Sequence, residues 1–162
     1  MKKYKNILLV VNLVAILAFV NYSAVRNETI RNNGTSILFE LYKDDLKKPF
    51  IQGDVMNLGY TVTQGLLFDT LYKRGYIVVT LDSNSIASRV RFQQFSYPIA
   101  AKEHIIEYSK NSKGIHIGPE QYFIQQGQSN KFRVAKYGSL QVDASGKALL
   151  MGLYDSTLRK IE

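Results

Sequence analysis

An uncharged and mainly apolar run over residues 6–25 dominates the hydrophobic pattern of the chain. At about 1.5 Å per residue, a helix over this run is roughly 30 Å long, which matches the hydrocarbon core of a bilayer. Near its middle lies Asn12, a polar residue that either marks a contact between helices in lipid or, as is commoner for a single asparagine, is simply tolerated there. We therefore expect residues 6–25 to form a transmembrane helix.

The residues that flank the run predict how the helix is oriented in the membrane and whether it is cleaved. Three lysines within residues 1–5 precede it and Arg26 follows it, so residues 1–5 are expected in the cytoplasm and the remaining chain outside. Cleavage of a signal peptide near the end of the run would place Asn21 or Tyr22 where a small residue is required. We therefore expect the helix to be kept as an anchor.

Beyond the run the pattern changes twice. Residues 26–34 are polar and predict an extension of the helix that ends at Gly34. Polar and apolar positions then alternate in short segments, which predicts strands joined by hairpin turns, and only residues 64–73 favour a short helix. We expect residues 35–162 to form one mainly β body, a small antiparallel barrel or sandwich. The expected strands are 35–41, 55–62, 76–81, 87–92, 104–109, 115–117, 122–126, 139–142 and 148–153.

Composition limits the classes of protein to which this body can belong. The chain has no cysteine, so burial and backbone hydrogen bonds must stabilise the body without disulfides. Its formal net charge is +8, but the lysines before the apolar run supply three of these charges and the other basic residues are scattered. Such a moderate, dispersed charge suits a position near anionic lipid headgroups and predicts no nucleic-acid-binding surface.

Candidate catalytic and metal-binding groups are few. His104 and His116 lie near the two ends of an expected hairpin, and with Glu103 or Glu120 they are a conceivable zinc site. Because a zinc site here would need carboxylate ligands from loops, we interpret both histidines as solvated strand residues. No serine stands in a Gly-x-Ser-x-Gly motif, and no pair of residues predicts a nucleophile with its base. The sequence therefore predicts no catalytic residue, no metal and no cofactor.

The most distinctive local sequence covers residues 53–60. Gly53 and Asp54 suit a tight turn, and Leu58 and Tyr60 fall on one face of the strand that follows. We interpret the segment as a stabilised turn before a core strand. The alternative is that Asp54 binds a ligand or a metal.

These residues resemble the signature of the bacterial GDYXXLXY proteins, with Val55 in place of the first tyrosine of that signature. The likeness continues through residues 75–79, 119–123, 136–138 and 142–153. It implies an inner-membrane protein with an outward body, in a family often encoded beside a polytopic membrane protein. The residues that it marks as structural or binding residues are Gly53, Asp54, Leu58 and Tyr60, followed by Tyr137 and Gly138.

A fainter resemblance is to the type I signal peptidases, which also have an N-terminal anchor, a Gly-Asp strand entry and a Pro-Glu-x-Tyr-Phe segment. Their catalytic serine would fall at Asp45 or Leu46, and their lysine at Ser88. Neither position holds the required residue, so no lysine activates a serine hydroxyl here. This resemblance implies a similar β fold without the catalytic pair.

Together these patterns favour a non-catalytic accessory or assembly subunit of a polytopic membrane protein. Its span would lie in the inner membrane and its body outside the cytoplasm. The alternative is an outward-facing hydrolase, or a binder of an envelope ligand, that uses the Asp54 region.

Overall fold

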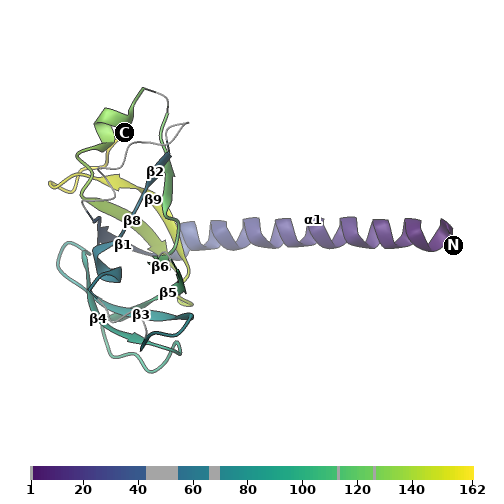
Figure 1. Ribbon diagram of the computed structural model, residues 1–162, viewed down its shortest axis with the longest axis horizontal. Coiled ribbons are helices and arrows are strands. Elements are labelled where there is room, and N and C mark those ends of the chain that lie inside the picture. The colour runs from purple at the N-terminus through teal and green to yellow at the C-terminus, as the bar shows by residue number, and fades with distance from the viewer. Residues whose placement is uncertain (1, 43–54, 66–69, 113, 126) are drawn as a thin grey trace.

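The computed structural model of the chain describes residues 2–42, 55–65, 70–112, 114–125 and 127–162. One long helix, α1 (Lys2–Asn33), projects from a body of short strands and stands clear of it for most of its length (Figure 1). Every large apolar side chain of the helix between Ile7 and Val25 is more than half exposed. The helix is long and apolar enough to cross a membrane, as the sequence predicts.

The strands of the body form three antiparallel sheets around one core. Single bridges join Leu38 to Ile86 and Leu41 to Tyr60 between these sheets. The prediction of a mainly β body is confirmed. Within the described residues the sheets do not close on one another, so the barrel of the expected barrel or sandwich is not confirmed. In spatial order, the sheets consist of β1 (Thr35–Glu40), β8 (Tyr137–Val142) and β9 (Ala148–Tyr154); of β2 (Val55–Asn57) and β7 (Gln121–Phe123); and of β4 (Ala87–Gln93), β3 (Arg74–Leu81), β5 (Glu103–Asn111) and β6 (Gly114–Ile117).

The core forms because alternate residues of a strand point to the same face of its sheet. Ile37 and Phe39 of β1 are completely buried, as are Ile77 and Val79 of β3. Ile106 of β5 lies opposite Ile77 and is buried with it. The alternation that predicted these strands therefore also identified the side chains that fill the core.

Two predicted elements differ from the structure. The strand expected over 55–62 ends at Asn57, and η2 (Thr61–Thr63), a short 3-10 helix, follows. The amide and hydroxyl of Thr63 both donate to the carbonyl of Tyr60, at 3.0 and 2.7 Å, and such local bonds compete with pairing in a sheet. The short helix expected over 64–73 has its centre, residues 66–69, outside the described part. The structure instead describes a short helix α2 (Ser129–Phe132).

One type of turn occurs at three places in the body. In each, an aspartate side chain accepts hydrogen bonds from the amides two and four residues later. The residue three positions after the aspartate is left-handed, with φ of 61°, 87° and 61° in the three turns. The carboxylate thus organises the reversal of the chain, as aspartate does in many turns. The aspartates and their left-handed residues are Asp82 with Ser85, Asp143 with Gly146, and Asp155 with Leu158.

The C-terminal end of α1 is joined to the body through Ile30 and Gly34. Ile30 is only 2% exposed, and the side-chain amide of Gln141 on β8 donates to the carbonyl of Gly34 at 2.5 Å. A Cβ atom at Gly34 would lie 2.6 Å from the carbonyl oxygen of Ile30 and 2.8 Å from Cγ of Gln141. Glycine is therefore required here by the close approach of helix and strand.

A second contact ties α1 to the turn between β8 and β9. Arg26 donates to Oγ of Ser145 at 3.2 Å, and its guanidinium lies 3.8 Å from a carboxylate oxygen of Asp143. Partial burial raises the pKa of Asp143, but hydrogen bonds from Ser145 and Lys147 and the charge of Arg26 together bring it below its ordinary value. The carboxylate therefore stays ionised and keeps both the turn and the helix in place.

A bidentate ion pair closes the connection between β4 and β5. The two terminal nitrogens of Arg91 lie 2.6 and 2.8 Å from the two carboxylate oxygens of Glu103, and the amide of Ala100 donates to the same carboxylate at 2.8 Å. The hydrogen bond from Arg91 and then that from Ala100 lower the pKa of Glu103 to about 2. Folding therefore favours the ionised form of this side chain.

We expect Gly34→Ala to lower the free energy of unfolding of the body by about 1–3 kcal/mol, because the added methyl group overpacks the helix–strand contact. Denaturant unfolding of the full chain in detergent, followed by circular dichroism, measures this change. The control is Asn33→Ala at the preceding, exposed position, for which we expect a change within about 0.5 kcal/mol. Equal stability of the two variants would contradict the close packing.

We expect the Arg91–Glu103 pair to make the stability of the body depend on pH. Because folding lowers the pKa of Glu103 from 4.5 to about 2, its contribution is full above about pH 4.5 and is lost as the pH falls towards 2. Glu103→Gln should therefore lose less thermal stability over this interval than the wild type. Melting temperatures measured against pH test this, with Glu107→Gln on the same strand as the control. Parallel curves for Glu103→Gln and the wild type would refute the prediction.

Candidate functional site

The motif segment after Asn57 is built into the core. Leu58 is 4% exposed and Tyr60 is 1% exposed. The amide of Leu58 donates to the carbonyl of Glu120 at 2.7 Å, so the motif is joined to the segment that leads into β7. The two residues that open the motif, Gly53 and Asp54, lie outside the described residues.

Tyr60 contacts several parts of the body at once. Its hydroxyl donates to the carbonyl of Pro119 at 3.1 Å, and its ring meets that of Phe39 edge-on, with the centroids 5.9 Å apart. Burial, and to a lesser extent the negative charge of Glu120, raise the pKa of Tyr60. The phenol therefore stays protonated and acts as a hydrogen-bond donor within the core.

The structure brings the second predicted motif against the first. A Cβ atom at Gly138 would lie 3.2 Å from Cε1 of Tyr60, so Gly138 leaves room for the tyrosine ring. Tyr137 is 8% exposed and lies on β8 opposite Glu40 of β1 and Tyr154 of β9. The two motifs thus meet at one junction between the sheets.

The two histidines of the conceivable zinc site are not brought together. Glu103 and His104 begin β5, where Glu103 is held by Arg91. His116 lies opposite Ser109, which follows His104 by five residues, so the two histidines are separated by roughly 16 Å along the sheet. Among the described residues, no three His, Asp or Glu side chains are grouped so that they could hold a metal ion.

His116 has partners on both sides of its ring. Nδ1 is hydrogen-bonded to the carboxylate of Glu120, and Nε2 lies 2.8 Å from Oδ1 of Asn111. Neither nitrogen is therefore left to take a proton from Ser109 across the strand pair. In the part of the chain that the structure describes, this network holds the segment after β6 and does not assemble a nucleophile with its base.

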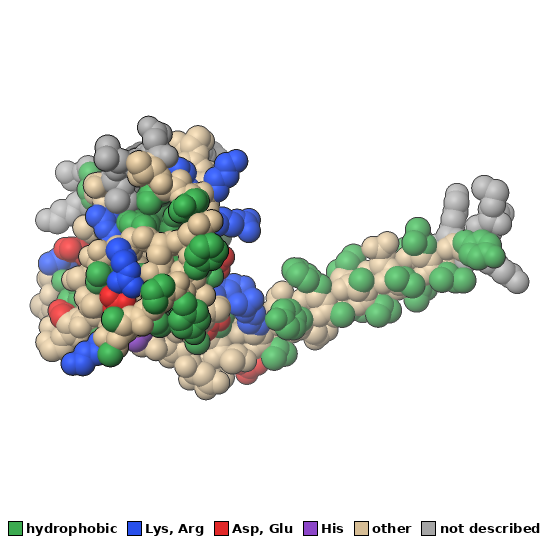
Figure 2. Space-filling view, turned by 90° about the horizontal axis from the view of Figure 1, so that it is seen from below, with side chains coloured by type: hydrophobic (Ala, Val, Ile, Leu, Met, Phe, Trp, Pro, Cys, Tyr) green, Lys and Arg blue, Asp and Glu red, His purple; other side chains and the backbone are tan. Residues whose placement is uncertain are grey.

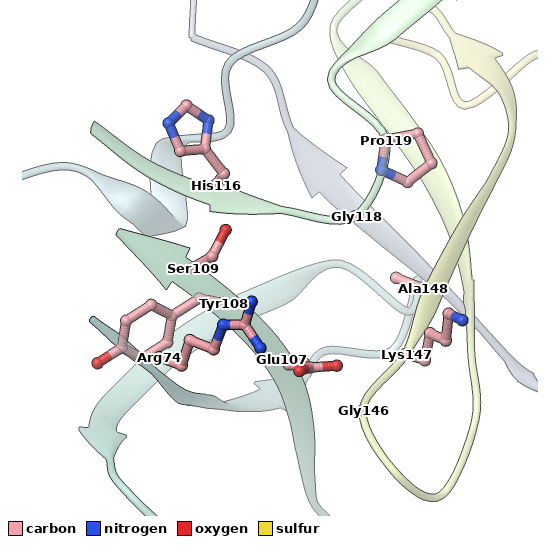
Figure 3. A pocket seen from close by; sticks show the side chains of 10 residues that line it. All are labelled: Arg74, Glu107, Tyr108, Ser109, His116, Gly118, Pro119, Gly146, Lys147 and Ala148. Atoms are coloured by element: carbon pink, nitrogen blue, oxygen red, sulfur yellow. The ribbon is translucent and has the colours of Figure 1, made fainter. Parts of the chain in front are cut away.

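A hollow of about 520 Å³ opens between β5, β6 and the turn that joins β8 to β9 (Figure 3). Arg74 and Lys147 bring positive charge to it, and Glu107 brings negative charge. Figure 3 shows the guanidinium of Arg74 facing the carboxylate of Glu107, with Lys147 on the opposite wall. The amide of Glu107 donates to the carbonyl of Gly146 at 2.8 Å, which fixes the floor of the hollow. This arrangement can bind a charged group.

Sequence reasoning did not identify this hollow. The charged residues of the hollow come from three elements: Arg74 from β3, Glu107 from β5 and Lys147 from the β8–β9 turn. In the sequence, each has the pattern of an ordinary solvated strand or turn residue. Pairing of β3 with β5 brings Arg74 near Glu107, and docking of the turn on β5 adds Lys147. The first signal peptidase position, at Asp45 or Leu46, lies outside the described residues, and Ser88 is an exposed residue of β4.

One known protein family matches the chain over a range that includes both motifs. The model of the family described as GDYXXLXY protein matches residues 16–153, which is most of the chain. The chain belongs to this family. No curated protein and no solved structure matches it. In this GDYXXLXY protein, the closing leucine and tyrosine of the signature are core residues, and Val55 lies on β2 opposite Phe123.

We expect Tyr60→Phe to lower the free energy of unfolding by about 1 kcal/mol, because the carbonyl of Pro119 loses its donor. Tyr60→Ala should cost about 3–5 kcal/mol, since it also empties the space beside Gly138. Denaturant unfolding of the full chain measures both changes. The matched control is Tyr97→Phe, because Tyr97 is 71% exposed. If Tyr60→Phe and Tyr97→Phe change stability equally, the buried hydrogen bond does not contribute as argued.

Proposed function

We propose that this GDYXXLXY protein is a non-catalytic subunit of an assembly built around a polytopic membrane protein. In this proposal α1 crosses the bacterial inner membrane with its N-terminus in the cytoplasm. The β body lies on the outer side and contacts the outward loops of the partner. The signature residues Leu58 and Tyr60 support the proposal because they are used within the core, which leaves the outer faces of the body for contacts.

The observation that carries the proposal is the exposure of α1. Its large apolar side chains from Ile7 to Val25 are 53–71% exposed, so the body does not bury them. Figure 2 shows apolar side chains along the helix and charged side chains where it joins the body. So much apolar surface is unfavourable in water and favourable in a bilayer. The lysines before the span support an N-terminus in the cytoplasm.

The rigid junction between helix and body supports a partner in the same membrane. Ile30 is buried in the body, Gln141 binds the carbonyl of Gly34, and Arg26 binds the β8–β9 turn. Because helix and body hold one relative position, a partner that binds the helix meets the body already oriented. Such preorganisation strengthens a contact made at two places.

Asn12 is the residue of the span that we assign to this contact. Its side-chain amide lies well inside the predicted span, where lipid offers it no hydrogen-bond partner. A polar group on a neighbouring helix provides one, and such bonds contribute about 0.6–2 kcal/mol to association in membranes.

Purification of the tagged full chain from native membranes in mild detergent tests the proposal. We expect one polytopic membrane protein to be recovered with it in fixed stoichiometry. Asn12→Leu should reduce the recovery of that partner roughly threefold or more, as expected for the loss of an interhelical hydrogen bond.

Val14→Leu is the control for Asn12→Leu. It introduces the same residue into the same apolar run without removing a polar group, so recovery of the partner should stay at the wild-type level. Recovery of the tagged chain alone from wild-type membranes would contradict the proposal.

A further inference from the structure

A small outward face lies on the sheet of β2 and β7. Val55 and Asn57 of β2 pair with Phe123 and Gln121 of β7, and side chains of directly opposed residues share a face. The residue between them on β2, Met56, is buried, so these four side chains point away from the core. Phe123 is 74% exposed, which is unusual for a phenylalanine of a folded body.

This face borders a groove beside the base of α1. The groove has a volume of about 1030 Å³, and its apolar lining includes Phe123, Leu149 and Met151. Glu28 and Arg31 of the helix line its other side, and their formal charges cancel. β2 and β9 lie on the side of the body from which the helix leaves (Figure 1).

The position of the groove along the helix places it at the surface of the bilayer. The apolar run ends at Val25, and the helix residues that line the groove lie within 27–32. They are therefore about 3–10 Å beyond the end of the run along the helix axis. The headgroup layer on each side of the hydrocarbon core is about 5–8 Å thick. Because α1 is clamped to the body through Ile30 and Gly34, this height is set by the fold.

We propose that the body rests on the lipid bilayer through this face, with Phe123 inserted among the headgroups beside the helix. Tyr22, which is 67% exposed at the end of the span, is a second aromatic residue at the same interface. Val55, which stands where the family signature has a tyrosine, lies opposite Phe123 on this face. The inference rests on the anchoring of α1 in the proposed function.

The chain has no tryptophan, so one introduced tryptophan reports its own surroundings. The test uses full-length Phe123→Trp in phosphatidylcholine vesicles, with and without lipid brominated near the headgroup end of its acyl chains. We expect emission shifted to shorter wavelength and loss of most of the fluorescence when brominated lipid is present. Gln121→Trp, on the same face of β7, should respond in the same way and serves if Phe123→Trp does not fold.

Two further variants serve as the positive and the negative control. Phe19→Trp lies within the apolar run and should be quenched strongly. Val134 is 63% exposed and precedes β8, whose far end leads to the turn that binds Arg26. Val134→Trp therefore lies about 20 Å from the helix base along the strand and should show little quenching.

Strong quenching of Phe19→Trp, with Phe123→Trp quenched no more than Val134→Trp, would overturn the inference and leave the anchor intact. In that case the face is free for a protein partner. Absence of quenching in Phe19→Trp would overturn the anchoring, and with it both the proposed function and this inference.

Discussion

The packing of Tyr60 connects the three-stranded sheet of β1, β8 and β9 to the segment ahead of β7. Its ring lies between Phe39 of β1 and Gly138 of β8, and its hydroxyl binds the carbonyl of Pro119 ahead of β7. Because the sheets do not close into a barrel within the described residues, side-chain packing at such junctions helps to hold them together. In this chain the tyrosine that closes the signature is therefore a buried residue that joins two parts of the body.

The turn between β8 and β9 has a comparable role between the anchor and the body. On one side Asp143 and Ser145 hold Arg26 of the helix, and on the other Gly146 accepts a hydrogen bond from the backbone of Glu107. One short turn therefore links α1 to the four-stranded sheet. It also forms a wall of the charged hollow, so the position of the hollow relative to α1 depends on the same contacts.

Turns were predictable from sequence only where their residues suit the required backbone. The turns that begin at Asp82 and Asp143 were expected, because Ser83 and Asn84 follow the first aspartate and Ser145 and Gly146 follow the second. The third turn begins at Asp155 and places Leu158 in the left-handed region, where a leucine is unfavourable. The bonds to the Asp155 carboxylate hold this turn, and just beyond it the amide of Ile161 donates to the carbonyl of Leu153 at 2.9 Å. Local sequence carries no sign of that contact.

The sequence by itself determined the elements whose causes are local. An uncharged run of sufficient length specifies the apolar helix, and alternation of polar and apolar residues specifies most strands, because each depends only on near neighbours. The tertiary structure alone decided the order of the strands, the open arrangement of the sheets and the meeting of Tyr60 with Gly138. It also assembled the hollow from three separate elements and placed Phe123 at the base of the helix. These features depend on which faces pack together, and residues distant in the chain supply both sides of every such contact.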